Sequence, residues 1–283
     1  CMATMIACTP TKQSTIDTTL QTKVDSILQN KMSEIGAISG QAIVMEVQTG
    51  EIKAMVGNGI SQESGLIRTA SLLTALETGK VKLSDTVDVG EGVYKVHDRE
   101  LLDHNWHRGG YGKLTTLQGL MVNSHIANYK NIERAFTEEQ AYFDMLNKMS
   151  YGQPENIEGL DSLKAAYFVT PNDRGWNNTS LAWFCIGYNQ QISPIQMLTF
   201  YNAIANDGKM VKPTLYKGET AVINPQIASK ANIDSLQMAL VKVVTEGLGK
   251  PAQSEKVQVA GVSGGFQIST EKDKSEGKMN TEY

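Results

Sequence analysis

Two chemically useful side chains stand at the start of an apolar segment near residue 65. Ser64 carries a hydroxyl group, and Arg68 follows four residues later, which places both on nearly the same face of a helix. A serine becomes a nucleophile when a neighbouring base takes its proton. Arginine cannot be that base, because its pKa above about 12 keeps it protonated. Ser64 is therefore either a helix N-cap, the commoner role for serine at such a position, or a nucleophile whose base lies elsewhere.

Histidines supply the other candidates for chemistry. His125 could act as a base near neutral pH, although a histidine hydrogen-bonded on a helix flank is the commoner case. Asp103, His104 and His107 lie close together, but no third ligand follows at a helpful spacing. We therefore interpret that segment as a surface loop, and we expect no metal site and no cofactor.

The overall composition excludes several classes of function. The 283 residues are 41% hydrophobic and 20% charged, as in ordinary soluble globular proteins, and can form one large domain or two small ones. The net charge of −4 does not favour a nucleic-acid partner. No segment approaches the roughly 20 apolar residues that span a bilayer. The three cysteines form neither a disulfide framework nor a metal-binding pattern, and Cys185 lies in an apolar run typical of a core.

Several elements must position these side chains. Asp17 is a candidate N-cap for a helix that ends before Gly36. Two β runs, Gln41–Val47 and Glu51–Val56, flank a turn and predict a hairpin. Apolar residues at three- and four-residue spacing then predict a buried helix that begins near Ser64 and stops at Gly79. These apolar positions are Leu66, Ile67, Ala70, Leu73 and Leu76.

The second half of the chain continues with helices and one predicted strand. Residues from Thr115 to about Met149 are mostly helical in pattern. Ser193 and Gln196 form a capping box around Pro194, which predicts a helix start. A further helix is expected over roughly residues 234–248, followed by a strand over residues 256–262. This order suits an α+β domain whose sheet joins strands distant in sequence.

From Thr15 onward the chain resembles the transpeptidase domain of class B penicillin-binding proteins. Any one matching segment could arise by chance, but their order and spacing together indicate the family. The matching segments are IDTTLQ, VMEVQTGEIKAMV, the helix ending in ALETGKV, KVHDRELLDHNWHRGGYGKLT, IGYNQQISPIQM and FYNAIANDGKMVKP.

The first two catalytic motifs of that family are substituted in this chain. The S-x-x-K motif supplies the nucleophile and its activating lysine, and the alignment places Gly65 and Arg68 at those two positions. In the S-x-N motif, Asn123 replaces the proton-relay serine and His125 replaces the asparagine that holds the substrate amide. Ser124 lies between them. The resemblance therefore implies that neither the usual nucleophile nor the usual base is present.

The third motif, K-T-G-[TS], is substituted as well. Val262 stands where the family has the lysine that binds the substrate carboxylate. Ser263 keeps a hydroxyl in place of threonine, Gly264 keeps the close backbone approach, and Gly265 replaces a hydroxyl residue. We expect all three motifs to be degenerate.

The resemblance implies an α+β, β-lactamase/transpeptidase-like fold, with an antiparallel sheet flanked by helices and an inserted all-helical subdomain. We expect a polar N-terminal tail over residues 1–15 and a transpeptidase-like domain over residues 16–283, with the helical subdomain at about 80–190. In this family two more strands and a C-terminal helix follow the third motif, whereas only residues 266–283 follow here. Either the chain is incomplete there, or the domain lacks an edge of its sheet.

Two functions follow from this resemblance. The favoured one is a catalytically inactive relative in peptidoglycan (cell wall) synthesis, which binds the stem peptide or acts as a scaffold for other cell-wall-synthesis proteins. The alternative is an active D,D-transpeptidase or carboxypeptidase-type acyltransferase with Ser64 as a displaced nucleophile, His125 as base, and backbone N–H groups of residues 64 and 265 as the oxyanion hole. Both imply a bacterial, extracytoplasmic (periplasmic) protein, and a membrane anchor upstream of residue 1 is compatible with either.

Overall fold

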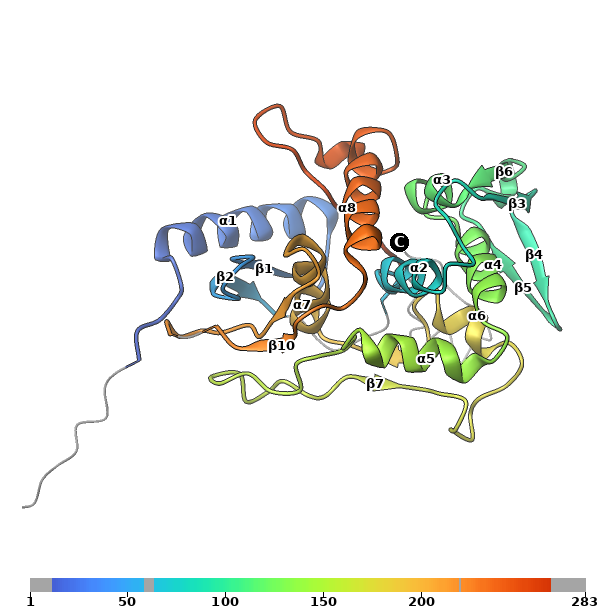
Figure 1. The fold of residues 1–283 in the computed structure, drawn as a ribbon. Coiled ribbons are helices and arrows are strands. Elements are labelled where there is room, and N and C mark those ends of the chain that lie inside the picture. Colours follow the sequence, from blue (N-terminus) through green and yellow to red (C-terminus); the bar gives the residue numbers. More distant parts are fainter. Residues whose placement is uncertain (1–11, 59–63, 219, 266–283) are drawn as a thin grey trace, which may run out of the picture.

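Helix α2, Ile67–Glu77, lies at the centre of the molecule (Figure 1). The computed structural model describes residues 12–58, 64–218 and 220–265. Within these ranges, ten consecutive residues of α2, from Ile67 to Leu76, are buried, so the helix is covered on all sides. The predicted stop at Gly79 is confirmed, because this glycine has a φ of +71°.

Three further helices pack around α2 and complete the main hydrophobic core. They are α4 (His125–Ala135), α5 (Glu139–Lys148) and α8 (Lys230–Thr245). Their apolar faces meet α2 in one continuous cluster that includes Leu73, Ile132 and Tyr142, each with no exposed surface. The periodic apolar positions of the sequence therefore become the interior, as the pattern indicated.

The predicted hairpin is confirmed. Strands β1 (Gln41–Met45) and β2 (Ile52–Gly57) pair in antiparallel register, with a bulge near Met45. Gly50 in the turn has a φ of +78°, and a Cβ atom built there would lie 2.4 Å from the carbonyl oxygen of Lys212. Only glycine fits a turn that presses against another segment in this way.

The N-terminal helix α1 (Thr18–Ile35) contacts both strands of the hairpin, and its predicted cap is confirmed. The side chain of Asp17 accepts a hydrogen bond from the backbone N–H of Leu20 at 2.9 Å. None of the helix's residues is fully buried, and Ile27 keeps 68% of its surface exposed.

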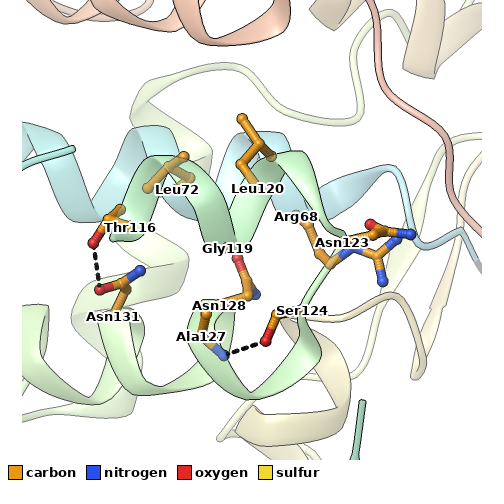
Figure 2. A pocket seen from close by; sticks show the side chains of 10 residues that line it. All are labelled: Arg68, Leu72, Thr116, Gly119, Leu120, Asn123, Ser124, Ala127, Asn128 and Asn131. Atoms are coloured by element: carbon orange, nitrogen blue, oxygen red, sulfur yellow. Dashed lines mark hydrogen bonds between the residues drawn. The ribbon is translucent and has the colours of Figure 1, made fainter. Parts of the chain in front are cut away.

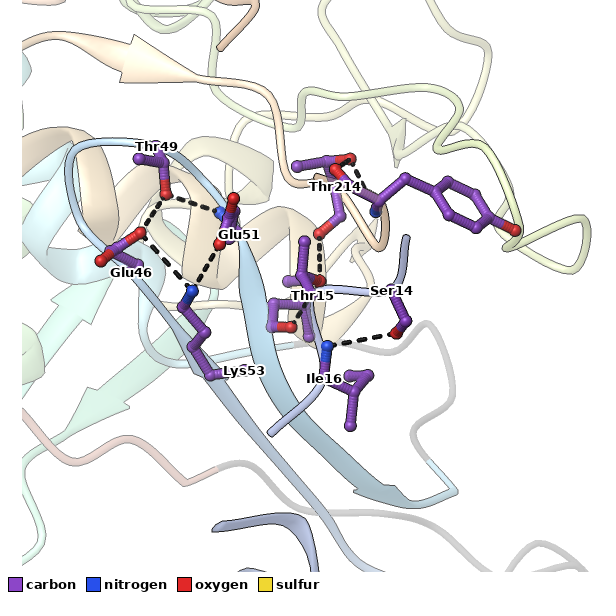
Figure 3. Close-up of polar contacts among 10 residues, drawn as sticks. Ser14, Thr15, Ile16, Glu46, Thr49, Glu51, Lys53 and Thr214 are labelled. Atoms are coloured by element: carbon purple, nitrogen blue, oxygen red, sulfur yellow. Dashed lines mark hydrogen bonds and ion pairs between the residues drawn. The ribbon is translucent and has the colours of Figure 1, made fainter. Parts of the chain in front are cut away.

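The segment before α1 belongs to the folded domain, so the predicted boundary of the tail at residue 15 is too late. Thr15 is buried, and its hydroxyl group donates to the carbonyl oxygen of Ile52 at 2.7 Å and to that of Thr214 at 3.2 Å (Figure 3). Its neighbour Ser14 forms an antiparallel bridge with Tyr216. Residues 1–11 of the predicted tail, including Cys1 and Cys8, lie outside the described residues.

The inserted region at about 80–190 is mixed, so the expectation of an all-helical subdomain is wrong. Strand β3 (Thr86–Gly90) pairs with β6 (Gly112–Thr115), and β4 (Val93–Val96) pairs with β5 (Arg99–Leu102), both antiparallel. Alternation of buried and exposed residues in β3 explains the pairing, since one face covers the core and the other meets solvent.

The predicted strand over residues 256–262 is wrong. These residues have no strand assignment and are mostly exposed. Their segment is held instead by a hydrogen bond from the N–H of Gly261 to the carbonyl oxygen of Leu240 on α8. The described strands consequently form five separate two-stranded pairs, rather than one sheet that joins distant strands.

The capping box at Ser193 is confirmed as the start of α7, and α8 begins four residues earlier than predicted. None of the helices within the described ranges is both long and apolar enough to cross a membrane. The remaining elements are η1 (Trp106–Arg108), α3 (Thr116–Met121), β7 (Tyr167–Phe168), α6 (Ser180–Phe184), β8 (Gln190–Gln191), α7 (Pro194–Ala205), β9 (Met210–Val211), β10 (Val222–Asn224) and η2 (Lys250–Ala252).

Candidate functional site

The three segments that the sequence predicts to correspond to the family's motifs converge at the N-terminal end of α2. Gly65 precedes the helix, and a Cβ atom built on it would lie 2.9 Å from the carbonyl oxygen of Gly265 and 3.2 Å from Nη2 of Arg68. A Cβ atom built on Gly264 would lie 2.8 Å from the backbone nitrogen of Leu66. The backbone of the third motif therefore touches the backbone of the first.

Ser64 lies beside this contact but does not cap the helix, so the prediction of Ser64 as N-cap is wrong. Leu66 is the N-cap and provides no side-chain cap bond. The hydroxyl oxygen of Ser64 accepts a hydrogen bond from the backbone N–H of Leu66 at 3.4 Å. No described base is hydrogen-bonded to this hydroxyl, and a nucleophilic serine needs one.

Arg68 extends from α2 into the interior and is 2% exposed. Its guanidinium lines a cavity of about 10 Å³, a space for a single water molecule, together with Asn123 and Ser124 of the second motif (Figure 2). None of its three side-chain nitrogen atoms has a hydrogen-bond partner among the described residues. Burial lowers the pKa of Arg68 to about 10, which still leaves it charged at neutral pH.

The second motif forms the start of α4 and is held by a buried carboxylate. Ser124 is the N-cap of α4, and its hydroxyl oxygen accepts from the N–H of Ala127 at 3.0 Å. The same hydroxyl group donates to Oδ2 of Asp103 at 2.7 Å, and the N–H of Ile126 donates to Oδ1 at 3.1 Å. Ser124 therefore has a structural role. Asp103 is wholly buried in these contacts.

His125 is half-buried, and its hydrogen bond goes to the backbone of Leu102 rather than to Ser64. Its Nδ1 lies 3.0 Å from the carbonyl oxygen of Leu102, so this nitrogen carries the proton and donates. Burial, followed by the charge of Arg68, lowers the pKa of His125 to about 3. A histidine with so low a pKa accepts a proton weakly, which disfavours the role of general base.

Asn123 joins helices α3 and α4 in a left-handed conformation with a φ of +59°. Asparagine tolerates this conformation better than most residues with a Cβ atom. Its side chain and that of Arg68 both line the small cavity drawn in Figure 2. The resemblance implies that the family has a proton-relay serine at the position of Asn123. The side-chain amide of asparagine cannot relay a proton as a hydroxyl group does.

Three residues that the sequence did not single out support the start of α2. A Cβ atom on Gly187 would lie 2.6 Å from the backbone nitrogen of Gly65, so only glycine fits there. Nε2 of Gln190 donates to the carbonyl oxygen of Ser64 at 3.1 Å, and the hydroxyl of Tyr201 donates to that of Leu66 at 2.8 Å. Gly187 and Gln190 lie in the segment IGYNQQISPIQM, so the resemblance already pointed to this region.

A second cavity, of about 370 Å³, is lined in part by Ser64. Leu66, Met197 and Val262 give it a mostly apolar lining, to which Ser64, Ile192, Ser193, Pro194, Leu198, Tyr201 and Gly261 also contribute. The valine at the third-motif lysine position therefore faces an apolar space. Such a space suits an aliphatic side chain of a ligand.

The architecture defines an α+β domain of the transpeptidase type. Residues 40–281 match the family described as "Penicillin binding protein transpeptidase domain", and the chain belongs to this family. The expected fold class is thereby confirmed.

Curated relatives agree with this assignment. Penicillin-binding protein PbpB of Mycolicibacterium smegmatis is 24% identical over 91% of this chain and 45% of the relative. Peptidoglycan D,D-transpeptidase FtsI of Escherichia coli K12 is 25% identical over 68% of this chain and 35% of the relative. The chain thus spans between about a third and a half of the length of these proteins.

Solved structures show the same fold. The apo transpeptidase domain of penicillin-binding protein 3 from Burkholderia pseudomallei has a TM-score of 0.81 at 21% identity, covering 94% of this chain and 80% of that one. Penicillin-binding protein 3 from Mycobacterium tuberculosis, solved in complex with aztreonam, has a TM-score of 0.78 at 22% identity over 92% of this chain and 65% of that one.

Proposed function

We propose that this domain acts in peptidoglycan synthesis without acyl-transfer chemistry, by binding the stem peptide. One observation carries the proposal. The space that a nucleophilic side chain at residue 65 would need is filled by the carbonyl oxygen of Gly265, 2.9 Å from the position of a Cβ atom. The base position beside it holds Arg68, a cation without a lone pair.

The apolar cavity supports a binding role. Its volume of about 370 Å³ lies between the first and third motif segments and is lined mainly by aliphatic side chains. A short peptide with small aliphatic side chains matches this lining. A scaffolding role for other cell-wall-synthesis proteins is the second form of this proposal. That role does not require a peptide in the cavity.

An extracytoplasmic location belongs to the same proposal, since peptidoglycan is assembled outside the cytoplasmic membrane. This part of the proposal rests on family membership. Fractionation of cells that express the complete protein, with a protease-accessibility assay on intact spheroplasts, tests it directly. Digestion of the domain from outside is the expected result, and protection would contradict it.

The alternative, an active enzyme with Ser64 as a displaced nucleophile, has less support. The hydroxyl of Ser64 borders the 370 Å³ cavity and is reachable by a ligand. However, no described base is hydrogen-bonded to it, and the pKa of His125, about 3, disfavours that residue as a base. Loss of both nucleophile and base in such enzymes costs several orders of magnitude in rate.

Intact mass after incubation with a reactive penicillin tests the two functions against each other. The wild-type chain, a Ser64→Ala variant and an active penicillin-binding protein are treated side by side. We expect an adduct on the active protein and none on either form of this chain. An adduct on the wild type that is lost in Ser64→Ala would establish the displaced nucleophile.

Isothermal titration calorimetry with a stem pentapeptide that ends in D-alanyl-D-alanine tests peptide binding. The matched control is the peptide of the same sequence with L-alanyl-L-alanine at its end. We expect weak, stereoselective binding to the wild-type chain. Equal heats for the two peptides would contradict a stem-peptide site and would leave scaffolding as the role to be tested.

A further inference from the structure

We propose that Arg68 is a carboxylate-binding residue at the N-terminal end of α2. The lysine of the third motif is absent, since Val262 takes its place. Arg68 supplies a cation from the first motif instead. If the proposed function holds, on which this assignment of the ligand rests, the carboxylate is the C-terminal group of the stem peptide.

Arg68 differs from the other buried polar residues of α2 in that its side-chain nitrogens have no hydrogen-bond partner among the described residues. Ser71 Oγ and the hydroxyl of Tyr142 are 2.7 Å apart, and the hydroxyl of Thr74 donates to the carbonyl oxygen of Ser71 at 2.7 Å. The hydroxyl of Thr69 lies 2.8 Å from that of Tyr201 and donates to it, because the proton of Tyr201 is given to the carbonyl oxygen of Leu66. All these buried groups have partners, whereas Nε, Nη1 and Nη2 of Arg68 have none among the described residues. A buried charge without a partner is costly, so a ligand that pairs with it is favoured.

No described carboxylate forms an ion pair with this guanidinium, although against the effect of burial the charge of the buried Asp103 raises its pKa. The oxygens of Asp103 already accept from Ser124 and Ile126, and the structure shows no ion pair to Arg68 in the described ranges. The first turn of α2 contains no acidic residue either. The positive end of the helix dipole therefore adds to the charge of Arg68 rather than being offset.

The position of the guanidinium connects it to the apolar cavity. Nη2 lies 3.2 Å from a Cβ atom built on Gly65, and the adjoining residues Ser64 and Leu66 line the 370 Å³ cavity. A ligand with its aliphatic part in that cavity would reach Arg68 past Gly65. The planar guanidinium matches a carboxylate in a bidentate arrangement.

The chain at Gly264 and Gly265 packs against residues 65 and 66, beside the guanidinium, and is the proposed cover of this group. The cavity beside Arg68 holds only about 10 Å³, so a carboxylate must displace this cover. The cover is composed of two exposed glycines, and in the described part of the chain their segment is held by the hydrogen bond from Gly261 to Leu240. A segment held by so few contacts opens at a low cost in free energy.

Thermal unfolding of the wild-type chain in different salts tests the site. Sodium acetate is compared with sodium chloride at equal ionic strength, and with acetamide as the uncharged analogue. We expect acetate to raise Tm by about 3 °C once its concentration exceeds the Kd tenfold, with no such rise in acetamide. Equal Tm values in acetate and chloride would overturn the proposal.

Variants separate Arg68 from other cations. Arg68→Met should lose the acetate effect, and Arg68→Lys should keep a reduced one, because lysine retains the charge without the bidentate geometry. Arg174→Met, which removes an exposed arginine, should respond like the wild type. An undiminished acetate effect in Arg68→Met would overturn the assignment, and if that variant does not fold, an undiminished effect in Arg68→Lys would do so.

The acid and amide forms of the stem pentapeptide then link the site to the proposed function. The wild type should bind the acid form at least tenfold more tightly than the amide, and Arg68→Met should bind both equally. Absence of binding to either peptide, with the acetate effect intact, would refute the peptide function but not the carboxylate site. The two failures are therefore distinguishable.

Discussion

At the scale of single residues, the proposal of a non-catalytic domain depends on Gly65 and Arg68 together. Glycine removes the nucleophile and also permits the backbone of Gly265 to approach closely. Arginine is a permanent cation and cannot serve as a base. Under the proposed function the two residues are consistent with each other, because they form a closed, positively charged contact in place of a reaction centre.

Restoring the motif residues is predicted to fail. In the double variant Gly65→Ser with Arg68→Lys, the new Cβ atom would lie 2.9 Å from the carbonyl oxygen of Gly265, so the two segments must separate. We expect no penicillin adduct by intact mass and a loss of stability of about 1–3 kcal/mol in chemical denaturation. Gly261→Ser is the matched control, because a Cβ atom there meets nothing within 4 Å. Stoichiometric acylation of the double variant would contradict this account of the site.

Replacing the charge of Arg68 alone is predicted to cost little. Arg68→Met removes an unpaired buried cation and keeps a side chain of similar length, so we expect unchanged or higher stability. Arg68 is 2% exposed, and substitutions of such buried residues usually lower the free energy of unfolding strongly. Unchanged stability would therefore set Arg68 apart from an ordinary buried residue. Urea unfolding measures it. A loss of more than about 3 kcal/mol would indicate that the guanidinium has a partner in solution.

His125 is predicted to make the folded state sensitive to mild acid. Its pKa of about 3 lies below the usual value of about 6.5, so the unfolded chain takes up the proton first. The contribution of the neutral His125 to the free energy of unfolding is fully present above pH 6.5. It declines as the pH falls from there toward 3, by up to about 1.4 kcal/mol per pH unit. Unfolding of the wild type and His125→Gln between pH 7 and 4 measures this. Parallel curves would show that the histidine is solvated like a surface residue.

At the scale of elements, α2 is tied to α8 by a carboxylate. Oε1 of Glu77, the last residue of α2, accepts hydrogen bonds from the backbone N–H of Ser229 at 3.0 Å and from the side chains of Ser229 and Asn232, both at 2.6 Å. Ser229 is the N-cap of α8 but forms no side-chain cap bond of its own. Glu77 therefore caps α8 from another helix and fixes the angle between the two.

Removal of this charge is predicted to destabilise the domain in a pH-dependent way. Hydrogen bonds from Ser229 and Asn232 lower the pKa of Glu77 against the opposing effect of burial, so its contribution is present above about pH 4.5 and is lost as the pH falls below. Glu77→Gln should lose about 1 kcal/mol at pH 7 and less at pH 4. Glu255→Gln, at an exposed position, is the control for urea unfolding. An equal loss at both pH values would rule out the charge as the cause.

At the scale of the whole molecule, distant segments are joined by a few buried polar contacts. The hydroxyl of Thr15 binds the carbonyl oxygens of Ile52 and Thr214, which connects the N-terminal segment to β2 and to residues about 200 positions later (Figure 3). Beside it, Lys53 forms ion pairs with Glu51 and, at 3.7 Å, with Glu46. These surface pairs contribute little by comparison with the buried hydroxyl.

Thr15→Val is predicted to weaken this junction. The substitution preserves shape but leaves a buried carbonyl oxygen without one of its donors, which costs about 1–3 kcal/mol. Thr19→Val on the exposed side of α1 is the matched control and should change stability by less than about 0.5 kcal/mol. Chemical denaturation compares the two. Equal effects would mean that the N-terminal segment is not part of the cooperative unit.

The sequence by itself determined the hairpin, the buried helix α2, the caps at Asp17 and Ser193, and membership of the transpeptidase family. Those features depend on local periodicity, on cap residues and on motif order, all of which are readable along the chain. From the resemblance, it also predicts that Gly65, Arg68 and Val262 depart from the family pattern, and this stays a prediction.

Only the tertiary structure decided how these departures fit together. Residues 256–262 have strand-like composition but lie against α8, because pairing depends on a partner strand and not on propensity alone. The strand pairs within the inserted region, the contact of Gly265 with Gly65 and the unpaired guanidinium of Arg68 likewise depend on residues far apart in the chain. Burial and hydrogen-bond satisfaction are properties of the packed molecule, and no local pattern encodes them.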